Sequence, residues 1–403
     1  MRLVVIHNRY RSTQPSGENL VVDQETALLR AAGHEVIPYE RASDDIARST
    51  RLRQALVPAR VIWSSEDRRE LAKLLKRTSP DLVHVHNTFP LISPSVLEAC
   101  RRHGVPVVAT LHNFRLMCAN AQLLRGGQPC ELCVGHVPWP AVVHGCYRDS
   151  VLATIPVAVG IQVHRGRSTW TNGVSTFIAV TEFVRRRMIA GGLPGTRIRV
   201  KPNFVPRPRR ARAGAGDYML FLGRLSPEKG VDILLDAWSS ELGRLLIVGD
   251  GPSRRELEAR AIHQGNSVRF LGAQPRERCM DLIAGARALV VASRWYETFG
   301  LVVVEAFAHG VPAIAPSLGV FPELVQDGRT GLLFAPGEAS ELRSKLEELA
   351  SPERSVQMGE EAQRLYETVY TPERNLEALL EIYREVIAQP PAEDGSIPGW
   401  QPS

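Results

Sequence analysis

Short apolar runs, each followed by a polar loop and a helical pattern, recur along the whole chain. The first run covers residues 3–6; a loop with Gly17, a helical pattern over 20–32 and a stop at Gly33 follow it. This order predicts a strand–helix–strand unit and therefore a parallel sheet. The runs do not alternate apolar with polar residues, which is typical of strands covered on both faces. We expect further strands at residues 82–85, 107–111, 177–180, 218–222, 245–248, 268–271, 288–291 and 313–315.

A segment rich in Pro, Arg and Gly divides this repeat into two parts. It covers residues 202–216 (PNFVPRPRRARAGAG), which is linker chemistry rather than core chemistry. The length of 403 residues also exceeds the roughly 250–300 at which a single core stops growing. We therefore predict an α/β protein with two doubly wound, Rossmann-like domains, at 1–205 and 206–388. The second ends in a helical pattern, 372–388, that could pack back on the first, and residues 389–403 are expected to be a disordered tail.

The hydropathy of the chain argues against a membrane-spanning protein. No stretch reaches the roughly 18–20 apolar residues that a spanning helix needs. The nearest approach is the largely apolar segment 151–163, which contains Pro156 and Gly160 and is expected to be a core or interfacial element. The first apolar run is too short for a signal-peptide core. We therefore expect a cytoplasmic protein, and peripheral attachment to the inner face of the membrane stays open.

Positive charge is concentrated in the first half of the chain. Residues 1–200 carry 26 Lys and Arg against 15 Asp and Glu, and residues 201–403 carry 23 against 28. An anionic partner would therefore meet the first half. The basic residues are scattered, and no helix-turn-helix, zinc-finger or aromatic RNA-binding signature accompanies them, so we do not expect nucleic acid as a partner.

Two glutamates stand eight residues apart in the segment WYETFGLVVVEAFAHG. If a helix begins near Gly300, Glu297 lies in the loop before it and Glu305 in its second turn. Both carboxylates could then face the crevice outside the sheet, where ligands bind in open α/β folds. The backbone N–H groups of 299–301 would suit an anionic or hydroxyl-rich ligand. Two solvated glutamates beside a buried helix are the alternative interpretation of the spacing alone.

Several motifs in order and in register make the family resemblance specific. The second half contains GRLSPEKG (223–230), VGDGP (248–252), FLG (270–272), the two spaced glutamates and FPELVQDGRTGLLFAPG (321–337), and the first half contains GHEV, PDLVHVHN, TLHN and KPNFV. Together these motifs resemble those of glycosyltransferase family 4. The resemblance implies retaining enzymes of the GT-B fold, with two Rossmann-like domains and an interdomain cleft.

The resemblance assigns the donor phosphates to one short loop. Arg224 offers a planar fork of donors and Lys229 a point charge, and both are expected to grip the diphosphate of a nucleotide sugar. Gly249 is expected at the donor as well. With two cations stabilising the leaving diphosphate, no catalytic metal is expected.

The same resemblance assigns the two glutamates to hydroxyl groups. Glu305 should hold the ribose, and Glu297 the transferred sugar, because a carboxylate can accept two hydroxyl hydrogen bonds. The backbone amides of Phe299, Gly300 and Leu301 should assist Glu297, which is expected to stabilise charge on the sugar rather than to act as a nucleophile.

Two positions of the first half match the family pattern incompletely. Gly17 follows the first strand and would let the backbone approach the diphosphate, but Ser16 replaces the first glycine of the usual pair. His112 matches the histidine of a strand-end His-Asp pattern and is expected near the reacting sugar. Asn113 replaces the usual aspartate, which leaves a carboxylate role at that position in doubt.

We therefore expect transfer of a sugar from a nucleoside diphosphate sugar to a hydroxyl acceptor, with UDP as the nucleotide that the family resemblance favours. Polysaccharide or glycolipid assembly in bacteria is the first setting, with a lipid-linked or polysaccharide precursor as acceptor. Tailoring of a small natural product, an idle sugar-nucleotide-binding partner, and a related epimerase or phosphorylase are the alternatives. The arginines between 115 and 187 could meet a phosphate-bearing acceptor or a membrane; an Arg-rich solvated surface explains them equally, because the chain has 44 Arg against 5 Lys.

Four of the six cysteines cluster in an insertion near 118–146. Cys130 and Cys133 form a Cys-x2-Cys pair, with Cys118 and Cys146 on either side. Such spacing can supply a structural four-thiolate zinc site, and reduced thiols or disulfides are the other interpretations.

Overall fold

The computed structural model describes residues 1–13, 16–210 and 212–389, and the chain folds into two compact units. Unit 1 contains residues 1–122, 131–201 and 376 onward, and unit 2 contains residues 123–130 and 202–375. The chain passes from one unit to the other between Lys201 and Pro202, at the start of the Pro- and Arg-rich segment. The tail expected at 389–403 lies, beyond residue 389, outside the described residues.

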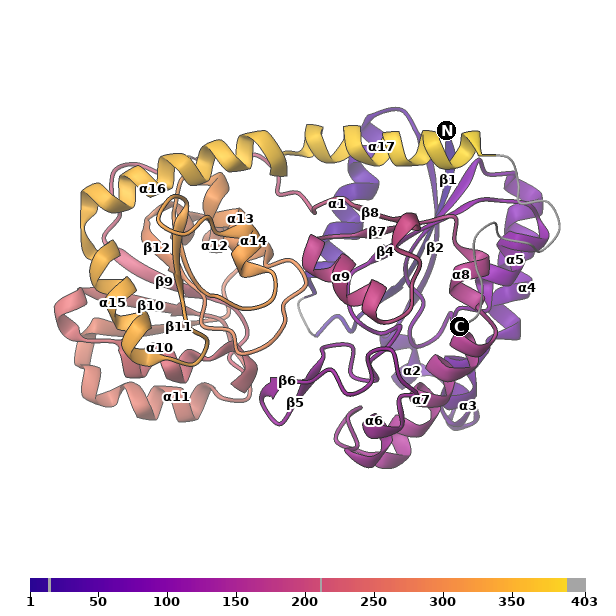
Figure 1. Cartoon of the computed structure of the whole chain (residues 1–403), viewed down its shortest axis with the longest axis horizontal. Coiled ribbons are helices and arrows are strands. Elements are labelled where there is room, and N and C mark those ends of the chain that lie inside the picture. Colours follow the sequence, from indigo (N-terminus) through magenta and orange to yellow (C-terminus); the bar gives the residue numbers. More distant parts are fainter. Residues whose placement is uncertain (14–15, 211, 390–403) are drawn as a thin grey trace. The chain divides into compact units, whose positions relative to one another are not determined.

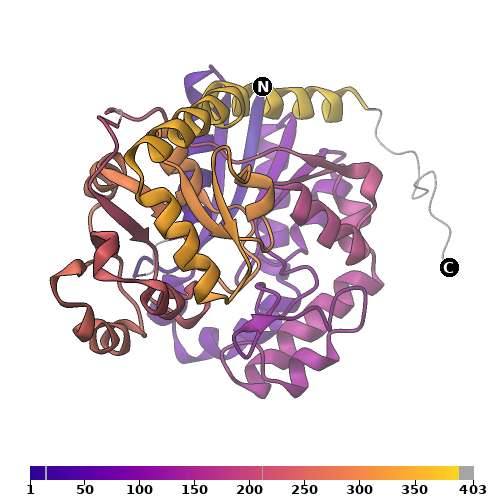
Figure 2. The same cartoon turned by 60° about the vertical axis from the view of Figure 1, so that its left-hand side comes forward.

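Unit 1 is built on a six-stranded parallel sheet with the order β2-β1-β3-β4-β7-β8 (Figures 1 and 2). Its strands are β1 (Arg2–Arg9), β2 (Glu35–Ala42), β3 (Leu82–Asn87), β4 (Val107–Leu111), β7 (Thr176–Ala179) and β8 (Ile198–Val200). Its helices are α1 (Gly17–Ala31), α2 (Asp44–Arg48), α3 (Arg51–Ile62), α4 (Ser65–Thr78), α5 (Val96–Arg102), α6 (Trp139–Val143), α7 (Val151–Gly166), α8 (Thr169–Gly173), α9 (Glu182–Ala190) and the 3-10 turn η1 (Gly195–Arg197).

Helix α17 (Pro372–Ala388) supplies part of the core of unit 1 from the end of the chain. Its buried residues Leu379, Ile382, Tyr383 and Val386 pack with residues of β1, α1, β3, β4 and β7. The helix therefore completes one face of the first sheet although it follows unit 2 in the sequence.

Unit 2 has a second six-stranded parallel sheet, with the order β11-β10-β9-β12-β13-β14. Its strands are β9 (Tyr218–Leu222), β10 (Arg244–Val248), β11 (Val268–Gly272), β12 (Ala286–Val290), β13 (Ala313–Pro316) and β14 (Gly331–Phe334). Its helices are α10 (Val231–Ala237), α11 (Arg254–Ala261), α12 (Arg276–Ala284), α13 (Leu301–Ala308), α14 (Phe321–Leu324), α15 (Ala339–Ala350) and α16 (Pro352–Leu365), with short helices η2 (Pro227–Lys229), η3 (Ser240–Leu242), η4 (Ile262–Ser267) and η5 (Tyr366–Tyr370). A hairpin of β5 (Leu124–Arg125) and β6 (Gln128–Pro129) is grouped with this unit.

Both sheets confirm the predicted class, two doubly wound α/β domains. All nine strand segments named from the sequence lie within or beside an observed strand. The short edge strands β8 and β14 were not predicted, because three or four residues at a sheet edge give too little pattern to separate them from a loop.

The apolar segment 151–163 forms most of α7, and none of the described helices is long and apolar enough to cross a membrane. One side of α7 packs into unit 1 through Val157, Ala158 and Ile161, whereas Leu152 is 82% exposed. The helix is thus apolar on both its buried and its exposed side, which is unusual for a surface helix.

A buried ion pair joins α1 to the residue that follows β8. The ammonium of Lys201 donates to a carboxylate oxygen of Glu25 at 2.9 Å, and both residues are almost fully buried. Two charges removed from water stabilise each other only as a pair, so neither can be removed alone without a large cost.

We expect Lys201→Met to lower the free energy of unfolding of unit 1 by about 3–5 kcal/mol, because it leaves the Glu25 carboxylate buried without its cation. Arg199→Met is the matched control: Arg199 lies on β8 and pairs with Glu385 at the surface, so its loss should cost less than about 1 kcal/mol. Calorimetric unfolding of both variants measures the difference. Equal losses would show that burial does not set the strength of the Glu25–Lys201 pair.

Candidate active site

The strand order of unit 2 reverses between β9 and β12, and the chemistry-bearing loops follow these two strands. The loop after β9 carries Arg224 and Lys229, and the loop after β12 carries Glu297. In open α/β sheets a ligand crevice forms outside the carboxyl ends of the strands at such a reversal. The fold therefore brings residues 68 positions apart, Lys229 and Glu297, to one place.

Two glycines let these loops pack backbone against backbone. Gly249, at the end of β10, has φ of 138°, and a Cβ there would lie 1.8 Å from the carbonyl oxygen of Gly223. Gly230, with φ of 65°, would place a Cβ 2.0 Å from the carbonyl oxygen of Ala292. No side chain fits at either position. Steric exclusion therefore explains why the motifs GRLSPEKG and VGDGP have glycine at positions 230 and 249.

Glu297 is held as a carboxylate by its neighbours. The ammonium of Lys229 donates to Oε1 of Glu297 at 2.6 Å, and the hydroxyl of Ser293 donates to the same oxygen at 2.7 Å. Burial by itself would raise the pKa of Glu297, but the charge of Lys229 and the hydrogen bonds from Lys229 and Ser293 outweigh it and hold the pKa below its usual value. Glu297 is therefore ionised at neutral pH.

Glu305 lies in α13, which begins after Gly300, as the spacing predicted. Its side chain is only 7% exposed and pairs with Nη2 of Arg276 at 2.8 Å, not with Lys229. Burial raises the pKa of Glu305, and Arg276 opposes this shift. Arg276 was not predicted as a neighbour, because α12 precedes β12 in the chain and only the sheet brings it beside α13.

The remaining predicted residues of unit 2 lie at the start of α13 and on the loop after β9. Phe299 is buried and packs edge-on against Tyr370, and with Gly300 and Leu301 it forms the start of α13. Arg224 is exposed on the loop after β9, and the described residues offer its guanidinium no ion pair. An exposed guanidinium without an ion pair can contact a ligand that arrives from solvent.

In unit 1, His112 follows β4 and meets His86 at the end of β3. Nε2 of His112 lies 2.9 Å from Nδ1 of His86, so one of these nitrogens carries the proton between them. His86 lies 3.6 Å from the Glu25 carboxylate, and His84, two residues earlier on the same strand, lies 3.5 Å from it. Burial lowers the pKa of His84, to about 4, and holds the pKa values of His86 and His112 well below their usual value. The histidines are neutral at pH 7.

Glu25, His84 and His86 place their ligand atoms within 4.8 Å of one another, and among the described residues they form the only such group. Both nitrogens of His84 are already hydrogen-bonded, to the hydroxyls of Thr110 and Tyr383. The ammonium of Lys201 occupies the other side of Glu25. This donor set is that of a hydrogen-bonded network rather than of a metal site.

Glu18 is a buried acid beside Asn113 that the sequence interpretation did not single out. Asn113 Nδ2 and the hydroxyl of Tyr10 each donate to Oε2 of Glu18 at 3.1 Å. Burial raises the pKa of Glu18 to about 7. Glu18 directly follows Gly17, in the first turn of α1. The sequence does contain one signal for Glu18: it follows the first strand and therefore lies at the same sheet edge as His112.

The clustered cysteines do not meet as metal ligands within unit 1. Cys118, Cys133 and Cys146 belong to this unit, and no group of them lies within the 4.8 Å spacing. Cys133 packs in an apolar cluster with Ala119, Ala141, Val157 and Ile161. All six cysteines are described, and none forms a disulfide bond. The four-thiolate zinc site, which would also need Cys130, stays a prediction.

Comparisons with known proteins match this arrangement along most of the chain. A family model described as Glycosyltransferase Family 4 matches residues 15–207, and one described as Glycosyl transferases group 1 matches residues 207–365. The phosphatidyl-myo-inositol mannosyltransferase of Mycobacterium leprae is 30% identical over 378 residues, which is 89% of this chain and 91% of that protein. The chain belongs to glycosyltransferase family 4.

Other relatives match shorter stretches. The alpha-D-kanosaminyltransferase of Streptomyces kanamyceticus is 31% identical over 44% of this chain and 48% of its own length, and the GDP-mannose-dependent alpha-mannosyltransferase of Mycobacterium tuberculosis is 31% identical over 66% and 64%. These and two further relatives are matched over 30–64% of their own lengths. The match to the mannosyltransferase of M. leprae, in contrast, extends over nearly the full length of both proteins.

Solved structures share the GT-B fold of the family. HepE of Anabaena, in complex with UDP and glucose, has a TM-score of 0.67 at 18% identity and covers 96% of this chain and 100% of its own. The sucrose-phosphate synthase of Thermosynechococcus elongatus has a TM-score of 0.69 at 18% identity, with 96% and 99% covered. At this identity the likeness shows the fold alone.

We expect the stability of the protein, relative to Glu18→Gln, to fall as pH rises from about 4.5 to 7. The unfolded carboxyl ionises near 4.5, whereas the folded one stays protonated up to a pKa of about 7. Over that pH range the unfolded state binds fewer protons than the folded state. The free energy of unfolding of the wild-type protein therefore falls by about 3 kcal/mol, whereas that of the glutamine variant does not.

Melting temperatures measured from pH 4.5 to 8 test this, with the exposed Glu66→Gln as the control that should show no such trend. A constant difference between the wild-type protein and Glu18→Gln would contradict a buried, protonated Glu18.

Proposed function

We propose that this protein is a retaining glycosyltransferase that moves a hexose from a nucleoside diphosphate sugar to a hydroxyl acceptor. The observation that carries the proposal is the Lys229–Glu297 pair, 2.6 Å apart, at the strand-order reversal of unit 2. A cation and an ionised carboxylate at one crevice suit a ligand that is anionic at one end and rich in hydroxyls at the other.

The cations would take the diphosphate. Lys229 has three N–H donors, so it can keep its bond to Glu297 and still donate to a phosphate oxygen. Arg224, in the same loop, adds a fork of donors suited to a phosphate. Both charges would stabilise the nucleoside diphosphate as it leaves, when the bond between sugar and phosphate breaks. In this proposal the two side chains do the work that a divalent ion does in other phosphate-transfer sites.

The carboxylates would orient the sugars. Oε1 of Glu297 is taken by Lys229 and Ser293, which leaves Oε2 to accept hydrogen bonds from hydroxyls of the transferred hexose. Glu305 would hold the ribose hydroxyls, with Arg276 at its other side. An ionised Glu297 also stabilises positive charge that develops on the sugar ring.

UDP is the nucleotide we propose. HepE, which shares the fold, binds UDP and glucose, whereas the mannosyltransferase of M. tuberculosis depends on GDP-mannose. The acceptor would meet unit 1, where neutral His112 can accept or pass on a hydroxyl proton. The name of the M. leprae relative contains a lipid, phosphatidyl-myo-inositol, and we propose a precursor in polysaccharide or glycolipid assembly as the acceptor of this protein.

We expect Arg224→Ala and Glu297→Gln each to lower the transfer rate by about a hundredfold or more, because each removes a group that stabilises transition-state charge. Arg255→Ala, on the exposed face of α11, is the matched control. Transfer from UDP- and GDP-sugars is measured with melting temperature as a folding check, and NMR of the product gives its anomeric configuration. Full activity in both variants would overturn the donor site, and an inverted product would overturn retention.

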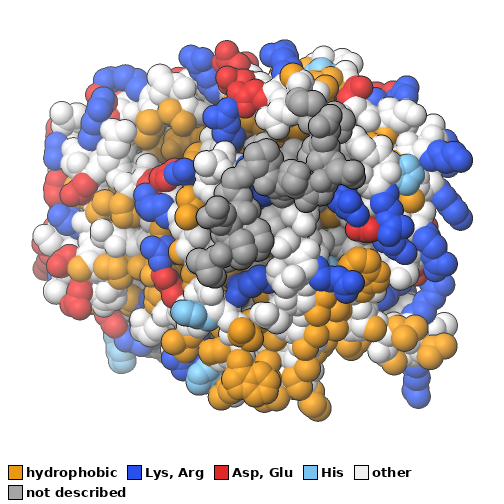
Figure 3. Space-filling view, turned by 45° about the vertical axis from the view of Figure 1, so that its right-hand side comes forward, with side chains coloured by type: hydrophobic (Ala, Val, Ile, Leu, Met, Phe, Trp, Pro, Cys, Tyr) orange, Lys and Arg blue, Asp and Glu red, His pale blue; other side chains and the backbone are white. Residues whose placement is uncertain are grey.

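We also propose that unit 1 attaches to an anionic membrane surface through α3, α6 and α7. Exposed apolar residues gather there: Leu52, Leu56, Val137, Trp139, Val143, Val151, Leu152, Ile155 and Val159. The space-filling view shows hydrophobic side chains over the lower part of the molecule, where these helices lie (Figure 3). The three helices contain no Asp or Glu, whereas α3 carries exposed Arg51 and Arg53. Apolar anchors flanked by cations suit an anionic bilayer.

We expect sedimentation with phosphatidylcholine vesicles to increase when phosphatidylglycerol is included. The double variant Trp139→Ser/Leu152→Ser should lower this partitioning by about tenfold or more, since each anchor contributes one or two kcal/mol of apolar burial. Ile262→Ser, at an equally exposed position of unit 2, is the control. If the double variant binds vesicles as well as the control does, the surface is not a membrane anchor.

A further inference from the structure

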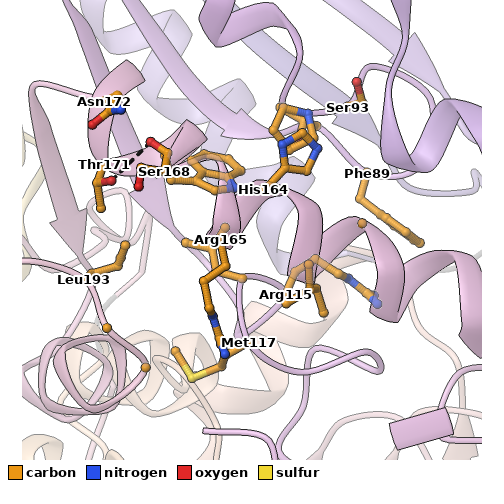
Figure 4. Close-up of a pocket in the computed structure, with 18 of the residues that line it drawn as sticks. Phe89, Ser93, Arg115, Met117, His164, Arg165, Ser168, Thr171, Asn172 and Leu193 are labelled. Atoms are coloured by element: carbon orange, nitrogen blue, oxygen red, sulfur yellow. Dashed lines mark hydrogen bonds between the residues drawn. The ribbon is translucent and has the colours of Figure 1, made fainter. Parts of the chain in front are cut away.

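Unit 1 contains a cavity of about 740 Å³, partly open to the surface, that lies between α7, α8 and the loops after β3, β4 and α9. Figure 4 shows the labelled residues around it, with a hydrogen bond from the Thr171 hydroxyl to the carbonyl oxygen of Ser168. Its volume falls within the roughly 300–1,000 Å³ typical of small-molecule sites. Neither the donor chemistry of unit 2 nor the histidine network uses this cavity.

The walls of the cavity are mostly apolar. Phe89, Met117, Val157, Ile161, Trp170 and Leu193 supply most of the large side chains. Val157 and Ile161 come from the buried side of α7, the helix whose other side is exposed and apolar. A cavity of this size and lining favours a ligand with an apolar body.

The charged groups of the lining are all cations. Arg115, Arg165 and Arg197 line the cavity, and no Asp or Glu does. His164 is there too. Burial lowers its pKa, and its hydrogen bond to the carbonyl oxygen of Ile62, at 2.7 Å from Nε2, opposes this shift without reversing it, so His164 is neutral at pH 7. None of the three arginines forms an ion pair with a carboxylate in the part of the chain that the structure describes.

The three guanidinium groups are partly satisfied by neutral partners. Arg115 stacks on Phe89, with its Cζ 4.1 Å from the ring centroid, and donates to the carbonyl oxygen of Ala119. Arg165 donates to the carbonyl oxygen of His136 through Nη1, while its Nη2 is buried without a partner. Arg197 donates to the carbonyl oxygen of Val174. A buried donor without an acceptor is costly, and an anion would satisfy it.

The cavity adjoins the proposed acceptor position. A smaller hollow of about 50 Å³ shares Thr88, Phe89, Arg115, Leu116 and Trp170 with it. The hollow also touches His86, His112 and Asn113. A molecule in the cavity can therefore extend a polar end toward His112 without leaving unit 1.

We propose that this cavity binds the acceptor, an amphiphile with an apolar chain and a phosphate, with the chain against α7 and the phosphate at Arg115 and Arg165. This inference rests on the proposed function, because it names the substrate class that receives the sugar. Apolar walls with cations and no carboxylate match such a molecule in both shape and charge. A sugar-only acceptor would leave these walls and the Nη2 group without a counterpart.

The test measures binding of farnesyl phosphate to the full chain by calorimetry, below its micellar concentration and without nucleotide. Farnesol and inorganic phosphate are the comparison ligands, one without the anion and one without the chain. We expect farnesyl phosphate to bind at least about tenfold more tightly than either, because both halves contribute. Equal binding of farnesol and farnesyl phosphate, or no binding of either, would overturn the proposal.

Two pairs of variants place the ligand. Leu193→Trp fills the cavity from a loop and should weaken the binding of farnesyl phosphate by about tenfold or more, whereas Gln162→Trp, at an exposed position of α7 outside the lining, should not. Arg165→Gln should remove most of the preference for the phosphate over the alcohol, whereas Arg167→Gln, on an exposed residue outside the lining, should keep it. Unchanged binding in Leu193→Trp or an unchanged preference in Arg165→Gln would overturn the placement, and melting temperatures confirm folding.

Nucleotide-sugar binding to the same protein separates this inference from the proposed function. If a UDP- or GDP-sugar binds and is turned over with another acceptor while farnesyl phosphate does not bind, the cavity proposal fails and the glycosyltransferase stands. If farnesyl phosphate binds at the cavity but no nucleotide sugar binds, the cavity is a ligand site and the proposed transfer fails.

Discussion

Parallel strands impose one constraint on which the candidate site depends: all of them end at the same edge of their sheet. In unit 2 the order of strands reverses between β9 and β12, so the loops after these two neighbouring strands lie at the position where ligands bind in open α/β sheets. Lys229 and Glu297 meet there at 2.6 Å. The close approach of Gly230 to the carbonyl oxygen of Ala292 holds the two loops in contact. The cation and the carboxylate are thus positioned by backbone packing rather than by their attraction alone.

The two units handle charge in different ways. In unit 2 Lys229 and Glu297 are partly buried and paired, and Lys229 keeps Glu297 ionised against the effect of burial. In unit 1 burial keeps His86 and His112 neutral and raises the pKa of Glu18, while Glu25 and Lys201 carry the one deeply buried ion pair of this network. Neutral histidines at the sheet edge of unit 1 suit hydrogen bonding to a hydroxyl group. The charged groups at the sheet edge of unit 2 suit an anionic ligand such as a diphosphate. The cavity next to His112 adds cations without acids to an otherwise apolar space.

Much of the fold could be predicted from the residues, because buried parallel strands produce continuous apolar runs that are visible in a single sequence. The edge strands β8 and β14 were missed, since a few residues at a sheet edge carry little pattern. Glu297 and Glu305 were placed correctly before and within α13, yet the partner of Glu305 is Arg276, from a helix that precedes β12. Glu18 was missed because a single acid in a first helical turn looks like an ordinary helix start until burial and Asn113 are seen around it.

The sequence by itself determined the βα repeat, the Pro- and Arg-rich segment that interrupts it, the loop glycines and the motifs of family 4. These features are local, because periodicity, turn residues and motif spacing need no knowledge of distant neighbours. Only the tertiary structure decided which side chains meet: Lys201 with Glu25, Asn113 with Glu18, and three arginines around one apolar cavity. Burial and pairing set the charge of these groups, and both depend on residues far away in the chain that only folding brings together.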